Sequence, residues 1–230
     1  MMETAQAAPI PVSEIFLTIQ GEGQHTGTPA IFVRTQGCPV GCPWCDTKYT
    51  WEADTALEVP PETLLADAQT QAQWSQLTPD DILSWCTHNA PQCKYVVITG
   101  GEPYLHNLAP LTTHLADAGY SIQIETSGTF PFSGGTWVWH TVSPKINMPG
   151  GYQVRRDCLE NADEIKHPVG KEQDLENLAT LLADVRLKAG TKVWLQPLSQ
   201  SPKATALCAA ACKEKGYYLS VQTHKYADVR

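Results

Sequence analysis

Residues 30–47, with the sequence AIFVRTQGCPVGCPWCDT, join an apolar, strand-like run to a loop that carries three cysteines. Cys38, Cys42 and Cys45 have the spacing C-x-x-x-C-x-x-C. Three thiolates on one short loop can hold three irons of a [4Fe–4S] cluster, whereas ferredoxin-type carriers close their clusters with four cysteines. The fourth iron then keeps an open position at which a small molecule can bind and be reduced. The spacing therefore favours a catalytic cluster.

Other uses of three thiols stay open at this point. Structural zinc sites take four ligands, commonly as two ligand pairs, and the sequence has no second C-x-x-C, although His25 or Asp46 could complete a site. Disulfides form in oxidising compartments. The sequence shows no hydrophobic signal segment, so we expect a reducing, cytoplasmic location. Thiols without a metal are the third alternative.

A second motif follows the cysteine loop. The apolar run YVVIT at residues 95–99 leads into Gly100-Gly101-Glu102-Pro103. A paired-glycine turn after a strand lets the backbone approach a ligand closely. With the cysteine loop before it, this turn resembles the radical S-adenosylmethionine (SAM) enzymes. The resemblance implies that the three cysteines hold the cluster, that the open iron takes the amino and carboxylate groups of SAM, and that the turn offers carbonyls to the methionine ammonium.

More specifically, the chain is similar to the 7-carboxy-7-deazaguanine synthase family from about residue 14 to residue 225. The similarity implies a radical lyase that abstracts hydrogen from C6 of 6-carboxy-5,6,7,8-tetrahydropterin. The ring then contracts to 7-carboxy-7-deazaguanine with loss of ammonia, on the route to 7-deazapurines such as queuosine. The blocks that carry the similarity are EIFLTIQGEG (14–23), CDTKYTW (45–51), QIETSG (123–128), VSPK (142–145), EIKHPVG (164–170), LQPLS (195–199) and VQTHK (221–225).

The resemblance also assigns site residues. The substrate contacts that it implies are Ile19, Gln20, Gly21, Arg34 and Thr99. The SAM contacts that it implies are Trp44, Cys45, Asp46, Gly101, Ser143, Pro144, Lys145, Gln196, Pro197, Leu198 and Ser199.

Two of the assigned residues also have ordinary structural explanations. Arg34 suits a carboxylate because its planar fork binds one in a two-pronged way, but by itself it could belong to a surface ion pair. The resemblance makes Thr47 a ligand of Mg²⁺, whereas the sequence alone would make it a turn cap. Magnesium prefers oxygen ligands and usually keeps waters and substrate oxygens, so one protein ligand is acceptable chemistry.

Size and charge set further bounds. The chain has 230 residues, 42% of them hydrophobic, which suits one globular domain. We expect residues 1–12 to form a flexible leader and residues 13–230 a single radical SAM domain. The net charge of −8 disfavours binding to nucleic acid, and no run is long enough to span a bilayer. The resemblance implies a homodimer and an electron donor such as flavodoxin.

Strand-like runs alternate with helical patterns, which predicts an α/β fold with a mostly parallel sheet. A full eight-fold barrel needs about 250 residues, and no good helix is evident between residues 123 and 166. We therefore expect an incomplete, partly opened (β/α) barrel of the radical SAM type, with the motifs at the carboxyl ends of its strands. The expected strands are 30–34, 95–99, 121–125, 137–142, 164–166, 193–196 and 218–222, and the expected helices are 61–73, 79–89, 108–119, 172–187 and 202–215.

Two other functions compete with this interpretation. A glycyl-radical activating enzyme shares the cysteine spacing and the small size, but it would need a large protein partner and would leave the blocks around Gln20 and Arg34 unexplained. A zinc-binding interaction module belongs to a different class, and iron analysis would distinguish it from a cluster protein.

Overall fold

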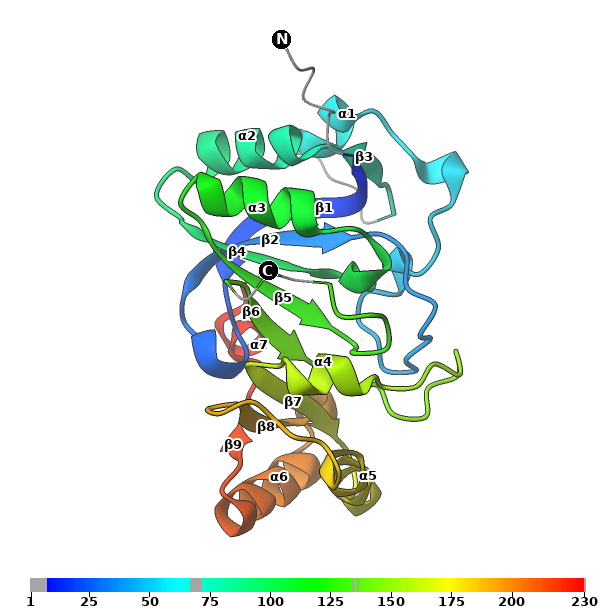
Figure 1. Ribbon diagram of the computed structural model, residues 1–230, viewed down its shortest axis with the longest axis vertical. Coiled ribbons are helices and arrows are strands. Elements are labelled where there is room, and N and C mark those ends of the chain that lie inside the picture. Colours follow the sequence, from blue (N-terminus) through cyan, green and yellow to red (C-terminus); the bar gives the residue numbers. More distant parts are fainter. Residues whose placement is uncertain (1–7, 67–71, 134, 136, 230) are drawn as a thin grey trace. The chain divides into compact units, whose positions relative to one another are not determined.

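The computed structural model describes residues 8–66, 72–133, 135 and 137–229 (Figure 1). In these residues, nine strands form a mostly parallel sheet that is not closed into a barrel. The expected α/β fold with an opened barrel is thereby confirmed. The strands are β1 (Ile10–Ile19), β2 (Pro29–Thr35), β3 (Ser75–Leu77), β4 (Tyr95–Gly100), β5 (Ser121–Thr126), β6 (Trp139–Val142), β7 (Glu164–Val169), β8 (Lys192–Pro197) and β9 (Tyr218–Leu219).

The helices lie mostly between consecutive strands of the chain, as expected for a parallel sheet. They are α1 (Pro61–Leu65), α2 (Pro79–Asn89), α3 (Ala109–Asp117), α4 (Arg156–Glu160), α5 (Glu172–Leu182), α6 (Pro202–Lys215) and α7 (Thr223–Ala227). None of the helices within the described residues is long and apolar enough to cross a membrane.

The chain divides into two compact units, each with its own helices. Unit 1 contains the described residues of 8–17, 30–124 and 133–138, and unit 2 those of 18–29, 125–132 and 139–229. The prediction that residues 13–230 form a single domain stays a prediction.

Unit 1 is built on the strand order β3-β1-β2-β4-β5, in which β1 and β3 run antiparallel and β2, β4 and β5 run parallel. Val96, Val97 and Ile98 of β4 are fully buried. Helices α2 and α3 pack beside one another (Figure 1). Helix α2 begins with a capping box, because the Thr78 hydroxyl accepts from Asp81 N at 3.1 Å and the Asp81 carboxylate accepts from Thr78 N at 2.9 Å.

Unit 2 has the parallel strand order β6-β7-β8-β9. All six residues of β7 are buried, as expected for a central strand that is covered on both faces. Helix α5 packs on β7 and α6 on β8. Helix α6 ends at Lys215 and is followed by Gly216, whose φ of 71° lies in the left-handed region that a glycine after a helix commonly adopts.

Several elements differ from the expectation, and β3 and α7 are two that were not expected. Helix α4 lies in the stretch where no helix was expected, because five residues are too few to show a helical period. Strand β1 was not expected and begins at Ile10, so the last residues of the proposed leader belong to the sheet, with Val12 fully buried. Helix α1 ends at Leu65, within the expected helix 61–73, of which residues 67–71 lie outside the described residues.

Candidate active site

The cysteine loop of unit 1 is closed by backbone hydrogen bonds. It follows β2, and Gly37 N donates to Thr50 O at 2.7 Å while Cys38 N donates to Trp51 O at 2.9 Å. These two bonds join the start of the loop to the residues directly after it. The three cysteines therefore lie on one short backbone ring rather than on an open segment.

The thiols on this loop suit a cationic cluster. Cys42 is buried, Cys38 and Cys45 are half-buried, and within the described residues none of the three forms a disulfide. Burial, together with the negative charges of Glu102 and of the other two cysteines, raises the pKa of Cys38 to about 11. A thiol must lose its proton to bind a metal. The positive charge of bound iron would favour the thiolate form that this binding needs.

The number of thiols also suits a cubane. Across the described residues, no three His, Cys, Asp or Glu side chains come close enough to ligate one metal ion. A cubane takes one thiolate per iron, so its ligands need not converge on a single point as zinc ligands do. Cys38, Cys42 and Cys45 can therefore hold three irons from one loop.

The Gly-Gly-Glu-Pro turn packs directly on the cysteine loop. It leaves β4 at Gly100, and Gly101 N donates to Thr35 O while Glu102 N donates to Gly37 O, both at 2.8 Å. A Cβ at Gly101 would lie 2.2 Å from Gly37 O, and Gly100 has a φ of 110°. Both positions need glycine, the first for close approach and the second for its backbone conformation.

Arg34 and Thr99 are register partners on the parallel strands β2 and β4. Arg34 Nε donates to Glu14 Oε1 at 2.5 Å, and the guanidinium carbon lies 5.7 Å from the centre of the Phe16 ring. Side-chain exposure is 17% for Arg34 and 6% for Glu14, so this ion pair is not a surface pair. The contact with Glu14 uses Nε, so the two terminal nitrogens form the edge that suits a carboxylate.

Three assigned residues surround the last cysteine of the loop. Trp44 is 41% exposed and Asp46 is exposed. The Thr47 hydroxyl lies 3.6 Å from Cys45 Sγ, while the Thr47 carbonyl accepts from Thr50 N at 2.9 Å. The backbone of Thr47 thus closes a turn, and its side chain stays beside the thiol.

Unit 2 holds the other assigned residues, beginning with Ile19, Gln20 and Gly21 at the end of β1. Ile19 is exposed and Gln20 is buried. A Cβ at Gly21 would lie 2.2 Å from His224 Nδ1, and Thr223 N donates to Gly21 O at 3.0 Å. The start of α7 therefore lies against the residue assigned to the substrate, which places His224 beside this segment.

The SAM-assigned loops of unit 2 follow β6 and β8. Ser143 N donates to Thr126 O at 2.8 Å, and Lys145 Nζ donates to Ser143 Oγ at 2.6 Å, with Pro144 between them. Ser199 lies in the left-handed region with a φ of 53°, which is uncommon for a residue other than glycine. Such conformations are concentrated at ligand sites. Gln196, Pro197, Leu198 and Ser199 form the end of β8 and the 3₁₀ turn after it.

A cluster of charges in unit 2 was not assigned from the sequence. Lys166 Nζ donates to Glu22 Oε2 at 2.5 Å and to Glu125 Oε2 at 2.8 Å. Glu125 Oε1 accepts from Gln20 Nε2 at 3.0 Å, which joins the cluster to a residue assigned to the substrate. One indication of this cluster was present in the sequence, namely the positions of its residues. All three lie within blocks of the family similarity, and Glu22 and Glu125 lie at or after strand ends.

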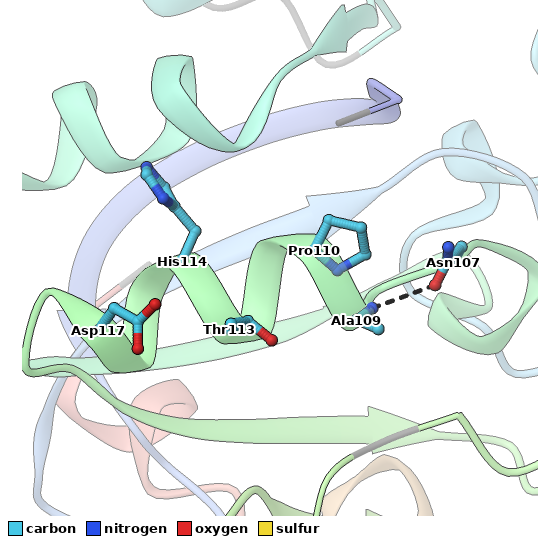
Figure 2. Close-up of a pocket in the computed structure, with 6 residues that line it drawn as sticks. All are labelled: Asn107, Ala109, Pro110, Thr113, His114 and Asp117. Carbon is cyan, nitrogen blue, oxygen red and sulfur yellow. Dashed lines mark hydrogen bonds between the residues drawn. The ribbon is translucent and has the colours of Figure 1, made fainter. Parts of the chain in front are cut away.

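A surface hollow on α3 is separate from these residues. Figure 2 shows the side chains that line it, and none of the assigned residues is among them. The lining residues are Asn107, Ala109, Pro110, Thr113, His114 and Asp117.

A family model supports the class to which the cysteine loop and the glycine turn point. Residues 32–133 match the model of the radical SAM superfamily. This stretch contains both the cysteine loop and the Gly-Gly-Glu-Pro turn that packs on it. The fold and the site thus define a radical SAM protein, a class that implies a [4Fe–4S] cluster and SAM.

Relatives that match nearly the whole chain identify the family within this class. The chain is 48% identical over 219 residues to the 7-carboxy-7-deazaguanine synthase of Escherichia coli (strain K12), covering 95% of this chain and 98% of the relative. It is 41% identical to the synthase of Buchnera aphidicola subsp. Schizaphis graminum (strain Sg), covering 96% and 99%. A crystal structure of QueE from Escherichia coli superposes with a TM-score of 0.88 at 47% identity, covering 93% of both chains. The chain belongs to the 7-carboxy-7-deazaguanine synthase family, which disfavours the activating-enzyme and zinc-module alternatives.

Proposed function

We propose that this chain is a radical SAM lyase that converts 6-carboxy-5,6,7,8-tetrahydropterin to 7-carboxy-7-deazaguanine and ammonia, in the biosynthesis of queuosine. The observation that carries the proposal is the family match over nearly the whole chain, including a glycine turn hydrogen-bonded to the cysteine loop. The two products together contain all atoms of the substrate, so the overall conversion needs no net oxidant.

The residues of unit 1 have distinct proposed roles. Cys38, Cys42 and Cys45 hold the cluster, which together with SAM supplies the hydrogen-abstraction chemistry when bound. Arg34 binds the substrate carboxylate through its terminal nitrogens, in a position fixed by Glu14. Thr99, its register partner, contributes a second substrate contact. Trp44, Asp46 and Gly101 contact SAM.

The residues of unit 2 complete the proposed set. Ile19, Gln20 and Gly21 contact the substrate, and Ser143, Pro144 and Lys145 contact SAM together with the segment Gln196, Pro197, Leu198 and Ser199. The bond from Lys145 to Ser143 and the left-handed backbone at Ser199 give these loops defined shapes, which supports a binding role.

Further parts of the proposal rest on the family likeness. Thr47 supplies a hydroxyl ligand to Mg²⁺, which orients the substrate carboxylate. The position of its side chain next to Cys45 supports this role. We also propose a homodimer, a one-electron donor such as flavodoxin and a cytoplasmic location.

Anaerobic turnover tests the reaction. Protein with a reconstituted cluster is mixed with reductant, SAM and the carboxytetrahydropterin, and the ultraviolet spectrum of 7-carboxy-7-deazaguanine is followed. We expect product to accumulate with release of ammonia. A fully loaded cluster that cleaves SAM but yields no deazaguanine would contradict the substrate assignment.

A further inference from the structure

The ammonium of Lys166 lies between two carboxylates from distant parts of unit 2. It donates to Glu22, which follows β1, and to Glu125, which belongs to β5. The far oxygen of Glu22 accepts from Gln222 Nε2 at 2.8 Å, and the far oxygen of Glu125 accepts from Gln20 Nε2 at 3.0 Å. Each carboxylate is thus oriented from two sides, and Lys166 is the contact that both share.

The lysine side chain is more deeply buried than the two carboxylate side chains. The Lys166 side chain is 4% exposed, whereas those of Glu22 and Glu125 are 15% and 16% exposed. A molecule that enters from solvent would therefore reach the carboxylates and not the ammonium. Ionised carboxylates accept hydrogen bonds at about four lone-pair positions and donate none. This face of the cluster is consequently suited to N–H donors of a ligand.

The charges around the cluster explain why the lysine is needed. Glu164 on β7 adds a third carboxylate near Lys166, and His224 on α7 interacts with Glu22. Burial by itself would raise the pKa of Glu22, but attraction to Lys166 and hydrogen bonds lower it to about 2. Burial lowers the pKa of Lys166, and the charges of Glu125 and Glu22 more than offset this effect and raise it. Without the ammonium, burial would favour the protonated form of Glu22.

We propose that Lys166 is a positioning residue, whose buried ammonium holds Glu22 and Glu125 side by side as ionised carboxylates that accept hydrogen bonds from the N–H groups of the substrate ring beside Gln20. The inference rests on the proposed function for the identity of the ring, and on the geometry of unit 2 for the role of the lysine.

The first test reads the carboxylates directly. Protein labelled with ¹³C at the glutamate carboxyl carbon is titrated by NMR as wild type, Lys166→Met and the matched control Lys192→Met. Lys192 lies on the neighbouring strand β8, and its ammonium donates to the exposed Gln24 side chain at 2.5 Å. We expect Lys166→Met to gain a glutamate signal that titrates above about pH 5, and Lys192→Met to titrate like the wild type. Unchanged titration in folded Lys166→Met would overturn the proposal.

The second test reads turnover against pH. In Lys166→Met, kcat/KM at pH 6 should be at least about tenfold lower than at pH 8, because protonation of a carboxylate removes an acceptor. Lys166→Arg should keep the wild-type profile, because it restores the charge, and Lys166→Met with Glu22→Gln should lose the acidic fall. An equal loss at all pH values would mean that Lys166 has only a structural role.

The two readouts separate this inference from the proposed function. A new titrating carboxylate in Lys166→Met, in a protein that forms no deazaguanine even as wild type, would retain the role of the lysine and reject the substrate. A wild type that turns over, with both tests unchanged in Lys166→Met, would reject the lysine proposal alone.

Discussion

Gly101→Ala should disrupt the contact between the glycine turn and the cysteine loop. The added methyl carbon would lie 2.2 Å from Gly37 O and 2.8 Å from Gly37 C, where ordinary contacts begin at 3.4 Å. Both atoms belong to the backbone, so no side-chain rotation relieves the overlap, and one segment must move by about 1 Å. The movement strains the hydrogen bonds from Gly101 N to Thr35 O and from Glu102 N to Gly37 O.

The steric overlap and the weakened hydrogen bonds together set the size of the effect. Overpacking in a well-packed site costs about 1–3 kcal/mol, and each weakened hydrogen bond adds up to about 1 kcal/mol. We therefore expect the free energy of unfolding to fall by roughly 1–5 kcal/mol, which many domains survive. Because Gly37 directly precedes Cys38, the variant should also bind less iron.

The assay combines urea unfolding of the metal-free protein with iron and sulfide analysis after anaerobic reconstitution. The matched control is Gly170→Ala, whose added carbon would lie 3.2 Å from the terminal methyl of Leu198, a contact that a flexible side chain can relieve. The control should change stability by less than about 1 kcal/mol. A Gly101→Ala protein with wild-type stability and wild-type iron content would refute the steric argument.

Three further predictions concern single residues. Burial lowers the pKa of His167 to about 4 from 6.5. Between these two pH values the unfolded chain takes up a proton that the native protein does not. The free energy of unfolding should therefore fall by up to about 3 kcal/mol as the pH drops from 6.5 to 4. Unfolding of His167→Gln should lack this slope, and an identical slope would point to another group. Cys42→Ala should lose the cluster absorbance and turnover together, so retained turnover would contradict the cluster assignment. Thr47→Ala should weaken the Mg²⁺ dependence of turnover at normal iron content, and an unaltered magnesium response would remove Thr47 from the metal site.

Local features of the sequence predicted much of unit 1. The apolar runs before the cysteine loop and before Gly100 became β2 and β4, because continuous apolar stretches identify buried parallel strands. Thr78 predicted the start of α2, because a capping side chain acts within three residues. In contrast, β1 was missed, since buried polar residues such as Glu14 interrupt its apolar pattern.

By itself, the sequence determined the family, the cysteine loop and the glycine turn, because each motif that identifies them consists of residues that are close together along the chain. Tertiary structure decided the partners of buried charges. The two carboxylates that accept hydrogen bonds from Lys166, those of Glu22 and Glu125, are 144 and 41 positions away in the sequence. A charge can stay buried only if the fold brings it a counter-charge, and such pairing over long separations leaves no pattern in a single sequence.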